Sequence, residues 1–188
     1  MEEMPVKFLM DRFGYCRTMD VATYERNKEA ADAESRYVLT CRNTDRLCIF
    51  TEKGKLHTAK IADLPYGKFR DKGQPIDNIS NYDSTQEEIV YICDSEQMRY
   101  AKLLFATKQG MVKKVEGTEF QVAKRTIAAT KLQAEDQVAS VQVINDNQQI
   151  VLQTKDGYFL RFPAEESGSS AQTRVGWDTG EIWPDRWM

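Results

Sequence analysis

The sequence predicts an all-β fold in which a short strand–turn–strand unit repeats to form a propeller-like array. The unit occurs four times, at Val6–Tyr24, Arg46–Pro65, Lys102–Phe120 and Gln149–Glu166. The turn glycines of the four units, Gly14, Gly54, Gly110 and Gly157, are separated by 40, 56 and 47 residues. Repeats of about 40–50 residues that each contain several strands are typical of propellers.

Each unit also ends at an aromatic or apolar residue that can anchor it in a core. These anchors are Tyr24, Leu64, Phe120 and Phe162. The turns TEKG, ATKQG and QTKDG place glycine where a hairpin needs a positive φ. Four unrelated hairpins in a β-sandwich are the alternative, but they would not explain why the anchors recur at a similar distance.

Further strands are expected between the units, where β-branched and aromatic residues gather. They are Val38–Cys41, Ile76–Ile79, Glu88–Asp94, Ile127–Thr130 and Gln137–Ile144. Residues 25–36 are polar and are expected to form a loop or a short exposed helix, because no apolar stripe supports a packed helix. Residues 94–99 are expected to turn the chain.

The predicted domain boundary follows the last unit. Residues 1–166 are expected to hold the array, with its repeats centred on the four turn glycines. Residues 167–188 are Ser/Gly-rich at first and then contain three tryptophans, so they are expected to form a linker and a tail. The array would therefore hold about three to four blades.

The composition excludes several classes of protein. Hydrophobic residues make up 41 % of the chain and charged residues 29 %, which is ordinary for a soluble protein. The sequence lacks an apolar run of about 18 residues, and its N-terminus MEEMPVKFLM lacks the basic region of a signal peptide. These features favour a cytoplasmic protein with no membrane contact.

Catalytic and metal-binding chemistry are not expected. The four cysteines, Cys16, Cys41, Cys48 and Cys93, form no CxxC pair, and His57 is the single histidine. Reduced core cysteines are therefore expected in place of a zinc site or disulfides. Phosphate-binding glycine motifs are missing, and the carboxylate pairs lie in turns where solvation is usual. No cofactor or catalytic residue is predicted.

Positive charge is concentrated in two segments, although the whole chain has a net charge of −3. Residues 102–131 carry +5 and residues 53–72 carry +4, so the rest sums to −12. Recurrence of cations in successive units would place positive charge along one edge of the array, which suits a phosphate backbone. For a single lysine, a solvated side chain remains the simpler interpretation.

The candidate phosphate-binding residues come from these segments and from matching positions in the first and last units. They are Lys108, Lys113, Lys114, Lys124, Arg125, Lys131, Lys60, Lys68, Arg70, Lys72, Arg17 and Arg161. His57 occupies a matching position in the second unit. Lys108 and Lys114 are expected to reach the edge of a blade together, whereas Lys113 and Lys114 face opposite ways in a strand.

Four segments resemble a known family in order along the chain. LLFATKQGMVKKVEGTEF (103–120) resembles a blade of the C-terminal domain of the type IIA DNA topoisomerase A subunit, which occurs in gyrase and topoisomerase IV. KLHTAKIADLP (55–65), GKFRDKGQPI (67–76) and QTKDGYFLRF (153–162) resemble neighbouring blades. The resemblance covers roughly residues 5–166 and implies a β-pinwheel whose basic rim binds and bends duplex DNA.

The resemblance also implies what this domain does in a larger enzyme. It would be non-catalytic, because the family's catalytic tyrosine lies in a separate cleavage domain, and its partners would be that domain and an ATPase B subunit. Gyrases usually carry a basic, glycine-rich box of the type QRRGGKG in the first blade, and Tyr24–Ala30 (YERNKEA) stands in its place. The missing box favours a topoisomerase IV-like or divergent protein. A propeller-like protein-interaction module with little DNA affinity is the alternative function.

Overall fold

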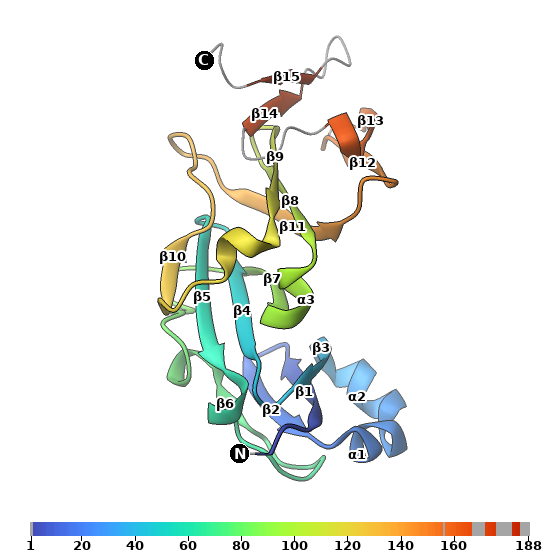
Figure 1. Ribbon diagram of the computed structural model, residues 1–188, viewed down its shortest axis with the longest axis vertical. Coiled ribbons are helices and arrows are strands. Elements are labelled where there is room, and N and C mark those ends of the chain that lie inside the picture. Colours follow the sequence, from blue (N-terminus) through green and yellow to red (C-terminus); the bar gives the residue numbers. More distant parts are fainter. Residues whose placement is uncertain (1, 156, 167–171, 176–181, 185–188) are drawn as a thin grey trace.

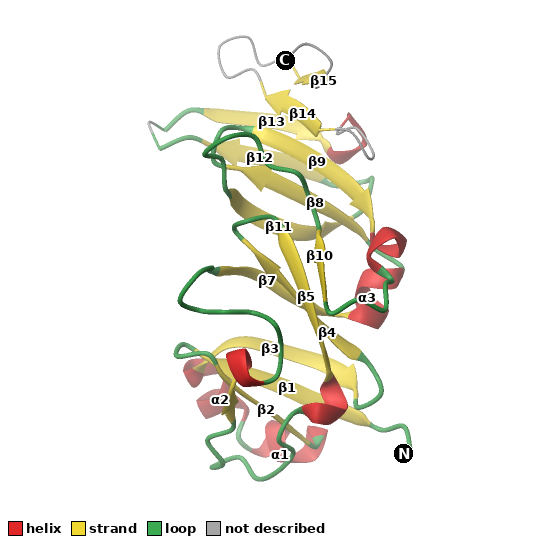
Figure 2. Ribbon diagram, turned by 90° about the vertical axis from the view of Figure 1, so that its left-hand side faces the viewer, coloured by secondary structure: helices red, strands yellow, loops and turns green. Residues whose placement is uncertain are grey.

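The molecule is built from four antiparallel β-sheets that follow one another along its long axis (Figures 1 and 2). A computed structural model describes residues 2–155, 157–166, 172–175 and 182–184. The first three sheets contain four or five strands each, and the fourth is the two-stranded hairpin of β12 and β13. The predicted all-β, propeller-like fold is therefore confirmed.

The strands of each sheet come from separated parts of the chain. The first sheet has the order β3-β1-β2-β6, with β1 (Pro5–Asp11), β2 (Tyr15–Met19), β3 (Ser35–Arg42) and β6 (Gln74–Pro75). The second has the order β10-β5-β4-β7, with β4 (Arg46–Thr51), β5 (Lys55–Lys60), β7 (Ile89–Asp94) and β10 (Thr126–Ala128). The third has the order β11-β8-β9-β14-β15, with β8 (Lys102–Thr107), β9 (Met111–Glu116), β11 (Val138–Ile144), β14 (Gln172–Val175) and β15 (Ile182–Pro184). The fourth pairs β12 (Gln149–Gln153) with β13 (Phe159–Pro163).

Helical segments are short and lie between the strands. The α-helices are α1 (Val21–Arg26), α2 (Lys28–Glu34) and α3 (Ser95–Arg99). The 3-10 helices are η1 (Ile61–Asp63), η2 (Ile76–Asn78), η3 (Gly117–Phe120) and η4 (Ala164–Glu166). Asp20 and Asp94 cap α1 and α3, since each carboxylate accepts a hydrogen bond of 2.7 Å from a backbone N–H three residues later.

Successive sheets are linked by strand exchange. β6 follows the β4–β5 hairpin in the chain but pairs with β2 of the preceding sheet. In the same way, β10 follows the β8–β9 hairpin and pairs with β5, and β14 follows the β12–β13 hairpin and pairs with β9. Each hairpin is thus followed by a strand that joins the sheet before it.

The exchanged strands define an outer edge of the array, opposite an inner edge. The inner strands are β3 of the first sheet, β7 of the second and β11 of the third, and each lies at one end of its sheet. β7 packs against both β3 and β11. The exchanged strands β6, β10 and β14 pair with the second strand of a hairpin, on the side away from these inner strands. Segments that lead to the exchanged strands therefore run along the outer edge.

Hydrophobic cores fill the spaces between successive sheets. Residues alternate along a strand between two faces, so Leu47 and Ile49 of β4 pack toward the first sheet while Cys48 and Phe50 pack toward the third. Phe50 contacts Phe105 at 5.7 Å between ring centroids. This two-sided burial explains why the middle strands read as continuous apolar runs.

Several expectations about individual residues are confirmed. The turn glycines Gly14, Gly54, Gly110 and Gly157 all have φ between 75° and 87°. The anchors Tyr24, Leu64, Phe120 and Phe162 are each at most 5 % exposed. All four cysteines are buried and free, and burial raises the pKa of the Cys16 and Cys41 thiols to about 12.

One local prediction is wrong, and the structure refines two others. Ile76–Ile79 is not a strand, because residues 76–78 form η2 and the strand is the preceding pair, Gln74–Pro75. The turn expected at residues 94–99 is made by the short helix α3, which Asp94 caps. Residues 25–36 lie largely in the short helices α1 and α2, as one of the two expected forms, and most of them are exposed, but Ala31 is buried against the outer face of the first sheet with Tyr24, Leu9 and Met19.

The predicted linker and tail fall mostly outside the described residues. Residues 167–171, 176–181 and 185–188 are not described, and Trp177 is among them. Between them, β14 occupies in the third sheet the position that β6 and β10 occupy in the first two.

Candidate nucleic-acid interface

Most of the predicted basic residues lie on segments that lead to the exchanged strands or leave them. We call this set the outer-edge basic surface and define it by seven of the predicted residues, Lys60, Lys68, Arg70, Lys72, Lys124, Arg125 and Lys131. All seven are exposed. They come from the loop before β6, the end of β5, and the residues on either side of β10.

The loop before β6 holds Lys68, Arg70 and Lys72 against the first sheet. The N–H of Thr18 in β2 donates to the Pro65 carbonyl at 2.8 Å, and the N–H of Gly67 donates back to the Thr18 carbonyl at 3.1 Å. Within the loop, the Lys68 N–H donates to the Asp71 carboxylate at 2.7 Å. The Lys72 ammonium lies 5.2 Å from the centre of the Tyr15 ring, a cation–π distance. These contacts position three cations without burying them.

A second group surrounds β10 at the edge of the second sheet. The Thr58 N–H donates to the Arg125 carbonyl at 2.8 Å, and the Thr58 hydroxyl donates to the Lys124 carbonyl at 3.2 Å. The Arg125 guanidinium donates to the Ile79 carbonyl at 3.0 Å. Lys60 ends β5, the strand that pairs with β10, and Lys131 follows β10. The backbone is therefore fixed while the side chains of Lys124 and Arg125 stay exposed.

Three other predicted residues lie on the third and fourth sheets. Lys108 is exposed in the β8–β9 turn, where its ammonium donates to Gln137 at 2.6 Å. Lys113 is half-buried in β9, opposite Phe105 of β8 and Gln172 of β14. Arg161 is exposed on β13, and its Nε donates to Gln149 at 3.3 Å. They are not on the segments that carry the outer-edge basic surface.

Two predicted residues are buried, which conflicts with the expectation that they face DNA. Lys114 is 6 % exposed, and its ammonium donates to the Ala164 carbonyl at 3.1 Å and pairs with Asp146 at 3.4 Å. Arg17 is 9 % exposed, and its guanidinium lies 5.6 Å from the centre of the Phe69 ring. Lys114 thus does not reach an exposed edge beside Lys108, and we leave both residues out of the proposed DNA surface.

His57 is also buried, and both of its ring nitrogens lie within hydrogen-bonding distance of other side chains of the protein. Its Nε2 lies 2.6 Å from the Glu87 carboxylate, and its Nδ1 lies 2.9 Å from the Thr126 hydroxyl. Glu87 also accepts from the Thr51 hydroxyl at 2.9 Å. The position three residues after the turn glycine holds Arg17, His57 and Lys113 in the first three hairpins. In the first two sheets the side chain at this position is buried.

Sequence reasoning missed two exposed cations beside β10. Lys55 is exposed in β5 directly opposite Ala128 of β10, and Lys53 is exposed in the turn before it. Both lie within the basic segment 53–72, so the charge count contained the signal even though the residues were not selected.

The described residues offer little for catalysis or metal binding. Burial raises the pKa of Cys16 and Cys41 to about 12, which keeps these thiols protonated and unreactive near neutral pH. Within the described part of the chain, no group of three or more His, Cys, Asp or Glu side chains is placed to hold a metal ion. No helix in that part is long and apolar enough to cross a membrane.

Strand exchange between successive sheets around an inner edge defines the class of this protein as a β-pinwheel, a propeller-like array. Residues 101–145 and 148–166 match the family described as DNA gyrase C-terminal domain, beta-propeller. The resemblance found in the sequence is therefore confirmed: the chain is related to the C-terminal domain of the A subunits of DNA gyrase and topoisomerase IV.

Relatives of known sequence agree with this match. The chain is 28 % identical over 182 residues to the DNA gyrase A subunit of Lawsonia intracellularis, covering 91 % of this chain and 22 % of the relative. It is 35 % identical over 125 residues to the DNA topoisomerase 4 A subunit of Bacillus subtilis, covering 65 % and 16 %. The chain thus spans about a fifth of the length of the relatives it matches.

Solved structures show the same fold. The C-terminal domain of DNA topoisomerase IV superposes with a TM-score of 0.78 and 25 % identity, covering 90 % of this chain and 55 % of that one. The E. coli ParC C-terminal domain superposes with a TM-score of 0.68 and 16 % identity, covering 86 % and 65 %. At the lower identity, the likeness concerns the fold alone.

Proposed function

We propose that this domain binds duplex DNA through its phosphates, using the outer-edge basic surface, and bends it toward the cleavage domain of a type IIA topoisomerase. The observation that carries the proposal is strand exchange, which brings two basic segments distant in sequence to the same edge of adjacent sheets. The loop with Lys68, Arg70 and Lys72 leads to β6, and Lys124 and Arg125 lead to β10. The match to gyrase and topoisomerase IV proteins supports the same role.

The chemistry of these residues favours phosphate contact over base reading. Long, exposed lysine and arginine side chains along this edge can each neutralise a phosphate, which releases counterions and makes affinity depend on salt. Phosphate contacts position a duplex but do not read its sequence. Binding would therefore tolerate any sequence and weaken steeply as salt rises.

In the parent enzyme, the domain would act without cutting DNA. We propose that its partners are duplex DNA, the ATPase B subunit, and the cleavage domain that belongs to the same polypeptide. We propose that contacts at successive sheets also bend the duplex, at an elastic cost that depends on its sequence. Lys108, Lys113 and Arg161 remain candidates for further contacts on the third and fourth sheets.

The test is a titration of two fluorescent duplexes of unrelated sequence at low salt. We expect both to bind with similar affinity, and Lys124→Glu with Arg125→Glu to weaken both equally. A matched control is Arg42→Glu with Arg99→Glu, which makes the same change of net charge at two exposed residues outside the outer-edge basic surface and should leave binding unchanged. Binding that survives reversal at Lys124 and Arg125 would remove them from the surface.

A protein-interaction module is the second candidate function. The net charge of −3 favours it, as do Tyr158 and Phe159, which are 68 % and 67 % exposed at the β12–β13 hairpin. It predicts weak DNA binding together with a stable complex with another protein. A pull-down with the intact domain, run beside the DNA titration, separates the two functions.

A further inference from the structure

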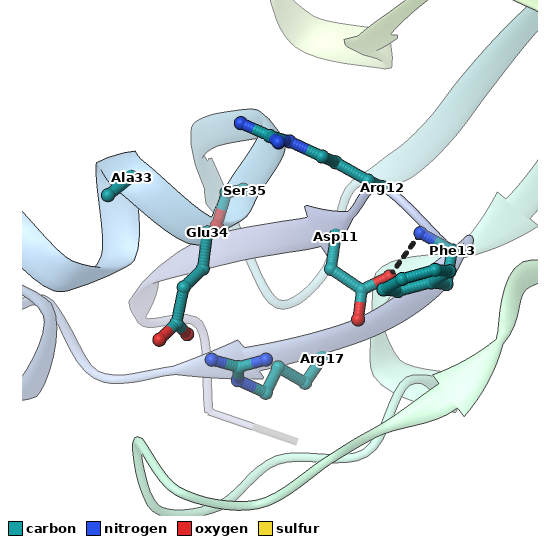
Figure 3. Close-up of a pocket in the computed structure, with 7 residues that line it drawn as sticks. All are labelled: Asp11, Arg12, Phe13, Arg17, Ala33, Glu34 and Ser35. Atoms are coloured by element: carbon teal, nitrogen blue, oxygen red, sulfur yellow. Dashed lines mark hydrogen bonds between the residues drawn. The ribbon is translucent and has the colours of Figure 1, made fainter.

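A polar pocket of about 400 Å³ opens where the β1–β2 turn meets the end of α2 (Figure 3). The seven residues that line it are Asp11, Arg12, Phe13, Arg17, Ala33, Glu34 and Ser35. Its volume falls within the range of about 300–1,000 Å³ that small-ligand sites span. None of the DNA contacts proposed above belongs to this set.

Arg17 forms one side of the pocket and has unused hydrogen-bonding capacity. Its side chain comes from β2 and is only 9 % exposed, and its Nε has no hydrogen-bond partner among the described residues. Figure 3 shows the guanidinium directed toward the carboxylate of Glu34. A buried guanidinium N–H without an acceptor is costly, so a ligand that supplies an acceptor here would be stabilised.

Two carboxylates flank the guanidinium, and they differ in what they can still bind. Asp11 is half occupied, since its Oδ1 accepts from the Phe13 N–H at 2.8 Å and from the Tyr15 N–H at 3.0 Å. Glu34 is exposed at the end of α2, and within the described residues it makes no hydrogen bond or ion pair. Glu34 is thus free to accept a hydrogen bond from a ligand.

Phe13 offers a flat surface at the mouth of the pocket. The ring is 88 % exposed, although its backbone is held in the turn by Asp11. An exposed aromatic ring on a fixed turn loses little freedom when a planar group stacks on it. Arg12 and Arg17 balance Asp11 and Glu34 in charge, so a neutral planar ligand would meet no net repulsion.

We propose that this pocket binds an unpaired guanine base. Guanine presents two acceptors, O6 and N7, which suit an arginine guanidinium. Its N1–H and amino group are donors that suit the Glu34 carboxylate, and its ring can stack on Phe13. A free guanine nucleotide and an unpaired guanine at a strand end share this chemistry. The site does not rest on the proposed function, because the base needs none of the outer-edge cations.

The experiment compares guanosine monophosphate with adenosine monophosphate, which carry the same phosphate. Amide chemical shifts around Phe13 and Ser35 are followed while the intact domain is titrated. We expect guanosine monophosphate to bind about tenfold more tightly, because adenine places a donor where guanine has O6. Equal dissociation constants, or no saturable shifts with guanosine monophosphate, would overturn the proposal.

Variants then place the base in the pocket. Phe13→Ala should weaken binding of guanosine monophosphate at least about fivefold through lost stacking. Tyr100→Ala, which removes another exposed aromatic ring stacked beside an arginine, should have no effect. If Phe13→Ala binds like the unchanged protein, the pocket is not the site. Phe13 is exposed, so this variant does not depend on replacing the buried Arg17.

Two competition experiments follow. The first distinguishes a free nucleotide from a base at a strand end, and the second distinguishes the guanine pocket from the proposed duplex-binding surface. A single-stranded oligonucleotide with a terminal guanine should displace guanosine monophosphate better than one with a terminal adenine if the source is a strand end. A blunt duplex should not displace it at all, since its bases are paired. Displacement by a blunt duplex would contradict the pocket, whereas failure of the duplex titration alone would contradict only the proposed function.

Discussion

Lys113 and Lys114 are adjacent in β9, and their side chains have different environments. Because neighbouring residues of a strand face opposite sides, Lys114 points toward the fourth sheet with Val112, where it meets Ala164 and Asp146. Lys113 stays half-exposed on the other face. Adjacent lysines in one basic segment thus have separate roles, and burial decides which of them can meet a phosphate.

Replacing Lys114 should affect stability and not DNA binding. In Lys114→Met, the Ala164 carbonyl loses its 3.1 Å donor inside the protein. We expect the free energy of unfolding to fall by about 1–3 kcal/mol, because the variant loses both the hydrogen bond of the buried ammonium to the Ala164 carbonyl and its ion pair with Asp146. Urea unfolding measures this change.

Lys113→Met is the matched control for Lys114→Met, since it removes the same charge from the next position. It should change the free energy of unfolding by less than about 0.5 kcal/mol. An unfolding curve for Lys114→Met that overlays the unchanged protein would mean that the buried ammonium contributes nothing to the fold.

At the scale of the element, the hairpin turns also support the exchanged strands. The Gly54 carbonyl accepts hydrogen bonds from the Ala129 and Thr130 N–H groups at 2.8 and 3.1 Å, directly after β10. The turn of the second hairpin therefore helps to hold a strand that comes from about 70 residues later in the chain.

The same substitution at two turns should have different effects. Gly54→Ala and Gly14→Ala both place a side chain at positive φ, which costs about 1–2 kcal/mol. At Gly54 the new Cβ would also lie 2.7 Å from the Thr130 carbonyl, whereas at Gly14 the nearest atom is 3.8 Å away. We expect Gly54→Ala to lower the melting temperature further. Equal melting temperatures would show that β10 shifts without cost.

The turn between β11 and β12 should make stability depend on pH. Hydrogen bonding to Lys102 and then to Lys114 lowers the pKa of Asp146 from its usual 3.8. The ionised Asp146 carboxylate therefore stabilises the folded protein at pH values above 3.8. This stabilisation is lost as the pH falls through the lower pKa of the folded state. Asp146→Asn should be less stable than the unchanged protein at pH 7 and equal to it in strong acid. Thermal unfolding across this pH range measures the difference.

The elements that sequence predicts well are those with a local pattern. The four hairpins have a turn glycine between two strands, and each is present in the structure. Strand exchange could not be predicted, because β6 and β10 contain two and three residues and have no periodicity of their own. Their partners are set by packing over long distances in the sequence. The sequence predicts a strand at Ile76–Ile79, but the single turn of η2 buries Ile76 and Ile79 as well.

At the scale of the whole molecule, charge and topology have to be combined to define a surface. Counting charges identified residues 53–72 and 102–131 as basic. It could not separate Lys114, which is paired inside the protein, from Lys124 and Arg125, which are exposed. It also could not predict that the loop at 68–72 and the residues near 124 lie along the same edge, since that depends on the exchange of β6 and β10.

The salt dependence of duplex binding tests the central claim most directly. The logarithm of the binding constant is plotted against the logarithm of salt concentration for the unchanged domain and for Lys68→Gln, Lys124→Gln, Arg125→Gln combined. We predict a steep negative slope that becomes shallower by about 0.9 for each phosphate contact removed. A slope near zero, or the same slope in both proteins, would contradict the claim that these residues bind the DNA backbone.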